Sequence, residues 1–415
     1  MSSSFRVPSW RPSARVFTAA LAGPALIAAC AGLSACSSSG SSSGGSSAPA
    51  SGNSSSSWVV GVTSEFSGTQ GGLGAGFSLG FNAAINAANN AGGVAGRKIK
   101  VTDMDDASNP TTARSNVTTF NSAGAIAVGG FTASNTGSGA FPLAAQYGIP
   151  FLVTTIAGST LNPSDGFKWI FLTQGLDNSY TESAEVQYAE TILKGKPHAK
   201  VAIAYIDTPS GVLGDATLKA ESQQQGWDVV TEQKLELTGT SVQPAIGAIV
   251  NAKPDVVLAE MAAQPEIPVL SGLRTAGYTG PIVNYGAGTS LASLNQLKDP
   301  DLVGMRVIHL PNQTQYSGIE QMVGAIKGDP SGLFVEEGYS QGLILIQALK
   351  DCGNSCTRSG LLQALDGLKN FNPGNFYSGP VSYTPQSHVA ALTYVPYTYK
   401  NGQVVQLSGT FTIKP

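Results

Sequence analysis

The chain has 415 residues, more than one hydrophobic core usually serves, so two lobes or domains are expected. Hydrophobic residues make up 42% of the sequence and charged residues 12%, with a formal net charge of −3 at pH 7. The 23 Lys and Arg residues are scattered along the chain. A nucleic-acid-binding surface needs concentrated positive charge to neutralise phosphates, so nucleic acid is excluded as a partner.

The first 35 residues have the order of a secretory signal. Three arginines, Arg6, Arg11 and Arg15, precede an Ala- and Leu-rich stretch over residues 16–33, and small residues follow it. The alternative is a transmembrane anchor. However, glycine and proline interrupt the stretch, and it is too weakly apolar to span a bilayer well. We therefore expect residues 1–35 to be a signal peptide.

The end of this segment, Leu33-Ser34-Ala35-Cys36, resembles the bacterial lipobox, in which the cysteine is acylated and becomes the first residue of the mature protein. Residues 37–57 are almost only Ser, Gly, Ala and Pro, a composition that behaves as a flexible coil. The sequence thus predicts lipidation of Cys36 and a tether over 36–57. The mature protein is expected to be exported and held on the outer face of the cytoplasmic membrane.

From Trp58 onward, short β-branched runs alternate with helical patterns, which indicates parallel sheets with helices on both faces. In the first half we expect strands at Trp58–Thr63, Lys98–Met104, Ala125–Val128, Pro150–Thr154 and Lys168–Leu172, and helices at Gly74–Asn90, Pro110–Asn121 and Asn135–Tyr147.

The same alternation then starts again. Strands are expected at Lys200–Ile206, Trp227–Leu235, Asp255–Ala259, Pro281–Tyr285, Met305–His309, Gly379–Tyr383 and Leu392–Tyr399. Helices are expected at Ser179–Leu193, Gly211–Gln224, Val242–Asn251, Glu266–Thr275, Ala292–Leu297, Tyr316–Ile326, Phe334–Leu349 and Arg358–Leu368. Two wound units of similar size predict two α/β lobes. Open parallel sheets bind ligands outside the carboxyl ends of their strands, so a ligand would lie between the lobes and closure would be a hinge motion.

Six short motifs follow one another in a fixed order. They are Glu65-Phe66-Ser67-Gly68, Gly92 to Ile99, Asp105 to Pro110, Gly129 to Ser134, Tyr147 to Pro150, and Gly175-Leu176-Asp177. Together they resemble the branched-chain amino-acid-binding proteins of the type I periplasmic-binding fold, the ligand-capturing components of ABC importers. The resemblance implies two doubly wound parallel-sheet lobes joined by three crossovers. Lobe 1 would comprise 58–174 plus about 311–378, and lobe 2 would comprise 175–310 plus about 379–415.

The resemblance also implies where a ligand would be held. In these relatives the loops after the third and fourth strands hold the ligand's carboxylate with backbone N–H and hydroxyl groups. Helix N-termini at such loops favour anions. Ordinary helix capping by Ser and Thr is the alternative role for these residues. The matching positions here are Thr132, Ala133 and Ser134, and Thr155, Ile156 and Ala157.

The second lobe departs from that pattern. Gly286 stands where relatives have an acid that pairs the ligand's ammonium, and Ser210 stands where they have a closing tyrosine. A free branched-chain amino acid is therefore not expected, because a buried unpaired ammonium is costly. Asp207 and Glu260 end second-lobe strands and could recognise a cation, or they could cap helices or face solvent. The expected ligand is a small carboxylate or amide without that charge, or a cation met by one of these acids.

Enzyme-like motifs have simpler explanations. Gly76 to Gly80 matches G-x-S-x-G, but the serine is expected inside a helix rather than on a strand-to-helix elbow. Asp106 is expected in a capping turn rather than in a calcium loop. The chain has three histidines, and His309 is expected at a strand end facing the cleft. No metal, cofactor or catalytic residue is predicted, and a serine hydrolase is kept only as a remote alternative.

Cys352 and Cys356 are separated by a turn-forming spacer. Exported proteins meet oxidising conditions, which predicts an intrachain disulfide between them. The sequence as a whole predicts a monomeric, lipid-anchored, non-enzymatic binder that passes a small molecule to ABC permease subunits. A ligand-sensing receptor domain for a membrane signalling partner is the alternative. Trp169 is expected beside the first crossover, where it would report closure.

Overall fold

The computed structural model describes residues 57–156, 167–174, 179–262, 264–286 and 288–414, which belong to one structural unit, Ser54–Pro415. The signal peptide, Cys36 and nearly all of the tether lie outside the described residues, as does Ala157. None of the described helices is long and apolar enough to cross a membrane.

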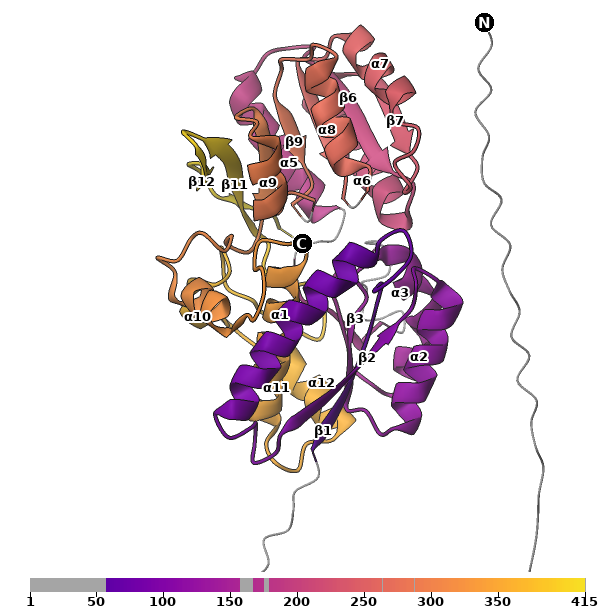
Figure 1. Ribbon diagram of the computed structural model, residues 1–415, viewed down its shortest axis with the longest axis vertical. Helices are drawn as coiled ribbons and strands as arrows, with labels where there is room; N and C mark the ends of the chain where they lie inside the picture. Colours follow the sequence, from indigo (N-terminus) through magenta and orange to yellow (C-terminus); the bar gives the residue numbers. More distant parts are fainter. Residues whose placement is uncertain (1–56, 157–166, 175–178, 263, 287, 415) are drawn as a thin grey trace, which may run out of the picture. The chain divides into compact units, whose positions relative to one another are not determined.

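The first lobe is built on a parallel sheet with the strand order β2-β1-β3-β4-β5, and Figure 1 labels the first three of these strands. Val60 and Val62 of β1 are fully buried in the core. Between them, a side chain at Gly61 would overlap the ring of Phe120, so glycine lets helix α2 (Pro110–Ser122) pack closely on the sheet. The strands are β1 (Trp58–Ser64), β2 (Ile99–Asp105), β3 (Ala127–Gly130), β4 (Phe151–Val153) and β5 (Ile170–Leu172).

Two helices far apart in sequence, α1 and α11, lie side by side in this lobe (Figure 1). A side chain at Gly80 of α1 would overlap the carbonyl of Val335, and one at Gly338 of α11 would overlap the carbonyl of Phe77. Glycine therefore brings the two backbones into direct contact. The helices of the lobe are α1 (Gly71–Asn90), α2 (Pro110–Ser122), α3 (Ser134–Ala140), α4 (Pro142–Tyr147), α10 (Ser317–Ala325), α11 (Val335–Cys352) and α12 (Arg358–Asp366).

The second lobe has a sheet with the order β12-β11-β10-β9-β8-β6-β7, and β13 pairs with β11. Strands β6 to β10 are parallel, and β11 and β12 add an antiparallel edge. The strands are β6 (Lys200–Ile206), β7 (Asp228–Leu235), β8 (Val256–Glu260), β9 (Ile282–Asn284), β10 (Leu302–Arg306), β11 (Thr393–Lys400), β12 (Gln403–Gln406) and β13 (Phe411–Thr412). The helices are α5 (Tyr180–Leu193), α6 (Pro209–Gln224), α7 (Gln243–Ala252), α8 (Glu266–Thr275) and α9 (Leu291–Leu297).

The two-lobed α/β architecture predicted from the sequence is confirmed, with corrections to individual elements. The helix expected over 135–147 is two helices, because Pro142 lacks an N–H and starts α4. The strand expected at 305–309 lies earlier in the chain, because β10 begins at Leu302 and ends at Arg306. Residues 379–383 form no strand and make only an isolated bridge, between Val381 and Phe371. A short 3₁₀ helix, η3 (Pro373–Asn375), precedes them.

The chain leaves β10 early because it crosses to the other lobe. Residues 307–316 run beside the returning segment 376–392, since Ser378 N–H donates to Val307 O at 2.8 Å and His309 N–H donates to Phe376 O at 3.2 Å. Further along, the returning segment bonds to β5, where Leu172 N–H donates to His388 O at 2.9 Å. These two segments tie the lobes together. The first crossover, predicted at Gly175-Leu176-Asp177, lies outside the described residues.

The structure joins Cys352, the last residue of α11, to Cys356 by a disulfide. The bond closes the turn between α11 and α12, where Thr357 is the N-cap of α12 and accepts a hydrogen bond from Gly360 N–H.

Candidate ligand-binding site

A small cavity lies where the carboxyl ends of strands from both sheets meet. Its empty volume is about 320 Å³. The first lobe contributes the loops after β1, β3 and β4 and the residue before α11, and the second lobe contributes the segments that end or follow β6, β8 and β9. This is the place where open α/β sheets bind ligands. The lining residues are Gln70, Leu73, Thr132, Ala133, Ser134, Thr155, Ile206, Thr208, Ser210, Glu260, Ala262, Tyr285 and Phe334.

The two lobes touch directly across this cavity. Ser134 Oγ of the first lobe lies 3.1 Å from Ser210 Oγ of the second, and Ser210 N–H donates to Ser134 Oγ at 3.2 Å. The lobes are therefore in contact at this point in the structure, and we expect a solute to enter when they separate.

The second-lobe wall of the cavity is acidic. Glu260 ends β8, is buried and lines the cavity. Behind it, Glu182 and Glu185 on α5 are also fully buried. Burial, reinforced by the charges of Glu182 and Glu260, holds the pKa of Glu185 well above its ordinary value. The pKa of Tyr285, which also lines the cavity, is raised by burial and then by Glu260 and Glu182. Among the described residues that line the cavity, none is Lys, Arg or His.

The first-lobe wall has a second acid directly behind it. The hydroxyls of Thr132 and Thr136 both donate to the carboxylate of Glu65, the latter at 2.8 Å. Burial raises the pKa of Glu65, and the two hydroxyls oppose that shift. Asp106 lies beyond it and accepts a hydrogen bond from Thr63 Oγ1 at 3.1 Å. Burial and the charge of Glu65 raise the pKa of Asp106 to about 7.

Six of the ten positions predicted to contact ligand line the cavity, three do not, and one lies outside the described residues. Ile156 is buried away from the cavity, and Ala157 is outside the described residues. Gly286 lies against β10, where its carbonyl accepts a hydrogen bond from Arg306 Nη1 at 2.7 Å. Asp207 lies outside the cavity with its side chain 39% exposed, 3.1 Å from Lys234 Nζ. The six are Thr132, Ala133, Ser134, Thr155, Ser210 and Glu260.

Sequence reasoning missed several lining residues. Gln70 is the N-cap of α1 and Leu73 lies in its first turn, within a glycine-rich run that carries no sequence signal for a binding site. Tyr285 directly follows β9, and a position just after the end of a parallel strand is a sequence signal for a ligand-binding residue. Phe334 was assigned to a helix, but it precedes α11 in a left-handed conformation with φ of 62°. No local sequence pattern predicts that conformation for phenylalanine.

The other motifs lie elsewhere. Ser78 lies inside α1, as the sequence predicted, and accepts a hydrogen bond from Asn82. Asp106 bonds to Ser108 N–H, whereas Asn109 is the residue that caps α2. The placement of His309 in the cleft is wrong, because the residue is buried at the crossover, stacked on Tyr316 and 2.7 Å from the Tyr397 hydroxyl. No group of metal-ligating side chains occurs among the described residues.

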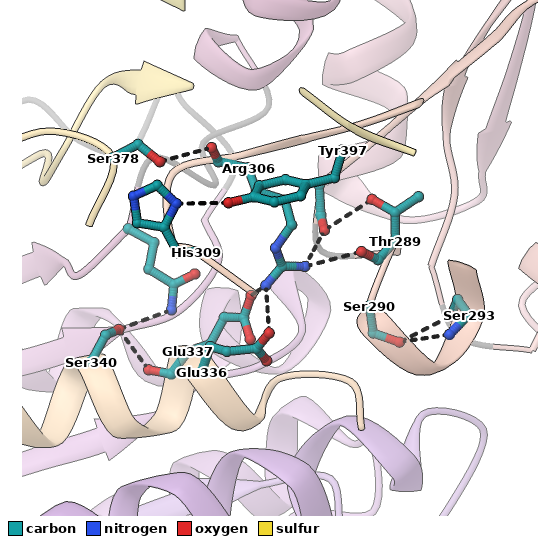
Figure 2. A network of polar contacts seen from close by, with 12 residues as sticks. Thr289, Ser290, Ser293, Arg306, His309, Glu336, Glu337, Ser340, Ser378 and Tyr397 are labelled. Carbon is teal, nitrogen blue, oxygen red and sulfur yellow. Dashed lines mark hydrogen bonds and ion pairs between the residues drawn. The ribbon is translucent and has the colours of Figure 1, made fainter. Parts of the chain in front are cut away.

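A buried ion network joins the two lobes beside the cavity. Figure 2 shows Arg306, the last residue of β10, directed at Glu336 and Glu337 near the start of α11. Arg306 Nη2 lies 2.9 Å from Glu337 Oε1 and 3.5 Å from Glu336 Oε1. Its Nη1 donates to the carbonyl of Gly286. Phe334, which lines the cavity, lies two residues before Glu336. The network therefore links the packing of the cavity wall to the joint between the lobes.

The fold and the cavity define a two-lobed binding protein that closes around a small molecule. The chain belongs to the periplasmic binding protein family, whose model matches residues 57–403. It is a solute-binding protein, and proteins of this family work outside the cytoplasm. No curated protein gives a significant match.

Solved structures share the fold at low sequence identity. A substrate-binding protein of an ABC transporter from Aeropyrum pernix has a TM-score of 0.77 and 19% identity, with 86% of this chain and 96% of that chain covered. A branched-chain amino acid ABC transporter protein from Thermus thermophilus with bound valine has a TM-score of 0.76 and 16% identity, with 87% of this chain and 98% of that chain covered. A solute-binding protein from Rhodopseudomonas palustris BisB5 with 3,4-dihydroxybenzoic acid has a TM-score of 0.74 and 20% identity, with 86% of this chain and 97% of that chain covered.

Proposed function

We propose that this protein captures a small solute bearing a positively charged amine and delivers it to the permease of an ABC importer. The observation that carries the proposal is the position of Glu260, whose buried carboxyl lines the cavity while no basic side chain among the described residues does. Glu182, Glu185 and Glu260 form one cluster, in which the charges of Glu182 and Glu260 raise the pKa of Glu185. The ammonium of a ligand would be attracted to this acidic wall when the lobes close.

An anionic ligand is disfavoured by the same arrangement. Glu182 and Glu185 lie behind Glu260, so a carboxylate entering the second-lobe side would add a like charge to buried acids. The structural neighbour from Rhodopseudomonas palustris holds 3,4-dihydroxybenzoic acid, which has no cationic group. The Thermus thermophilus neighbour holds valine, which has one. The acidic wall supports a ligand that carries an ammonium group, as valine does, rather than an aromatic acid.

The test is a binding panel with a matched control. Thermal shift and calorimetry would compare the amines agmatine, putrescine and isoamylamine with benzoate and 3,4-dihydroxybenzoate. We expect at least one amine to raise the melting temperature, because binding only the folded state stabilises it. Glu260→Gln should abolish that shift. Asp207→Asn should leave it unchanged, since Asp207 lies outside the cavity. Binding of the aromatic acids alone would overturn the proposal.

The remaining parts of the proposal concern location and mode of action. The lipobox-like sequence that ends at Cys36 and the Ser/Gly-rich tether support an anchor on the outer face of the cytoplasmic membrane. The absence of a nucleophile elbow at Ser78, which lies inside α1, supports binding without catalysis. Ligand recovered unchanged after incubation with the protein would agree with this, whereas turnover would contradict it.

A further inference from the structure

Three buried acids lie together on the second-lobe side of the cavity. Glu182 and Glu185 are three residues apart on α5, so they share one face of that helix. Glu260 lies beside Glu182, since a β-carbon at Gly214 of α6 would be 2.8 Å from Glu182 Oε1 and 2.9 Å from Glu260 Cγ. Glycine at this position of α6 therefore leaves the room that the two acids occupy.

Glu185 is held in this cluster without a polar partner among the described residues. Both of its carboxyl oxygens lack a hydrogen bond, and none of the ion pairs in the described part of the chain includes it. A fully buried carboxyl that has no donor directed at it and two acids beside it is favoured in its neutral form. The raised pKa of Glu185, caused first by burial and then by Glu182 and Glu260, agrees with this.

The basic side chains around α5 are paired elsewhere or exposed in the described structure. On α6, Lys219 pairs with Glu232, and on β10, Arg306 pairs with Glu337. Lys400 at the end of β11 is exposed. The other titratable side chains on the elements packed against α5 are Asp215 and Glu221 on α6, Glu260 on β8, Tyr285 after β9 and three tyrosines on β11.

A cation at Glu260 would change the balance of charge in the cluster. Neighbouring acids raise the pKa of one another, whereas an opposite charge lowers it. An ammonium docked against Glu260 would therefore favour ionisation of Glu185, whose proton would pass to the solvent. The bound cation replaces the lost proton, so the total charge of the cluster and its ligand does not change.

We propose that Glu185 couples binding of the cationic solute to release of one proton, so that the affinity of the cavity rises with pH. Glu185 does not line the cavity, so it is a positioning residue that acts through Glu260 rather than a contact of the solute. This inference rests on the proposed function and adds to it the regulation of the same site.

Calorimetry on the wild-type protein measures the proton directly. The best-binding amine of agmatine, putrescine and isoamylamine would be titrated at one pH in phosphate and in Tris, two buffers that take up a proton with different heats. The difference between the two apparent binding enthalpies gives the number of protons released per bound amine. We also expect the affinity to rise by up to about tenfold for each pH unit between about pH 5.5 and 8.5, where the amines stay charged.

Two substitutions at Glu185 and one control assign the proton. Glu185→Gln cannot ionise, so it should release no proton, and its affinity should match that of the wild type near the acidic end and stay flat as pH rises. Glu185→Met should behave in the same way and should fold, because an apolar side chain of similar size suits a buried site. Glu266→Gln is the matched control, because Glu266 is also a buried acid with a raised pKa but lies on α8 outside the cavity. It should keep both the proton release and the pH dependence.

The outcomes separate this inference from the proposed function. If amines bind in a Glu260-dependent way with no proton release and an affinity independent of pH, the role of Glu185 is overturned and the proposed function stands. If no amine binds at any pH, both are overturned. A proton release that survives in the folded Glu185 variants belongs to another group and overturns the role of Glu185, as does an affinity lowered equally at every pH. A release lost in these variants and kept in Glu266→Gln supports it.

Discussion

Arg306 of the second lobe lies 2.9 Å from Glu337 of the first lobe, and both side chains are buried (Figure 2). One arginine thus faces two adjacent acids, Glu336 and Glu337, at the joint between the lobes. Burial raises the pKa of Glu336 to about 8, although the charge of Arg306 opposes the shift. Burial therefore favours the neutral form of Glu336 at neutral pH, beside the contact between Arg306 and Glu337.

Removing the arginine should be strongly destabilising. Arg306→Met leaves Glu337 buried without its cation, which typically costs about 3–5 kcal/mol of unfolding free energy. Lys234→Met is the matched control, because it breaks the exposed pair with Asp207. Such surface pairs contribute about 0–1 kcal/mol. Urea denaturation of both variants checks the expectation. Equal losses of unfolding free energy would show that the buried pair contributes no more to stability than the exposed pair.

The raised pKa of Glu336 predicts a pH dependence with a definite sign. Its value is about 8 in the folded protein, against an ordinary value of 4.5. The folded state thus holds a proton that the unfolded state releases, so the stability that Glu336 contributes is fully present below about pH 4.5 and is lost as pH rises toward 8. Each unit of pKa difference corresponds to about 1.4 kcal/mol.

The difference between wild type and one variant isolates this effect from other titrating groups. Glu336→Gln keeps the shape of the side chain and cannot ionise, so its stability should fall less between pH 5 and pH 8.5. Denaturant unfolding at several pH values gives the two curves. Parallel curves would mean that Glu336 is already ionised or that it titrates equally in both states.

The sequence predicted the framework of the fold better than the polar contacts of the site. Strand–helix alternation located most elements, because burial of apolar runs is a local property. Glu260 and Asp207 gave the same signal, an acid at or just after the end of a strand. Only the structure shows that Lys234 on β7 pairs with Asp207 while Glu260 lines the cavity.

Long-range partners explain what else could not be predicted. Glu65 was visible as a member of a motif, but its acceptor role depends on Thr132 and Thr136, which lie 67 and 71 residues away. Arg306 and Glu337 are 31 residues apart and belong to different lobes. No periodicity or spacing in the sequence links such residues, because their contact exists only once both sheets are in place.

Tryptophan emission should respond weakly to closure, contrary to the role expected for Trp169. Within the described residues, Trp58 begins β1, Trp169 precedes β5 and Trp227 precedes β7. All three are at the amino ends of parallel strands, whereas the cavity lies at the carboxyl ends. Titration with a binding amine should change the emission little. Tyr285→Trp places a reporter in the cavity and should restore a clear change. A large change abolished by Trp169→Phe would contradict this expectation.

The membrane anchor can be tested independently of the ligand. Cys36 follows Leu33-Ser34-Ala35 and precedes the Ser/Gly-rich tether, so Cys36→Ser should leave the protein uncleaved or release it from the membrane fraction. Stable attachment needs more than one acyl chain, so the mature mass should exceed that of the bare polypeptide from Cys36. Unchanged fractionation and an unchanged mature mass in the variant would rule out lipidation at this residue.

The contact between α1 and α11 predicts opposite effects for two glycines of one helix. A methyl group at Gly80 would overlap the carbonyl of Val335 and crowd the backbone N–H of Tyr339, whereas one at Gly72 meets nothing within 4 Å. Overpacking a tight contact costs about 1–3 kcal/mol or more. Alanine in an open helical position is favoured over glycine by up to about 1 kcal/mol. Gly80→Ala should therefore lower the melting temperature, and Gly72→Ala should keep or raise it. Because α11 begins with the acids that hold Arg306, Gly80→Ala should also weaken amine binding. Melting curves and calorimetry on the pair check both effects, and a stable Gly80→Ala protein with unchanged affinity would show that the two helices can separate freely.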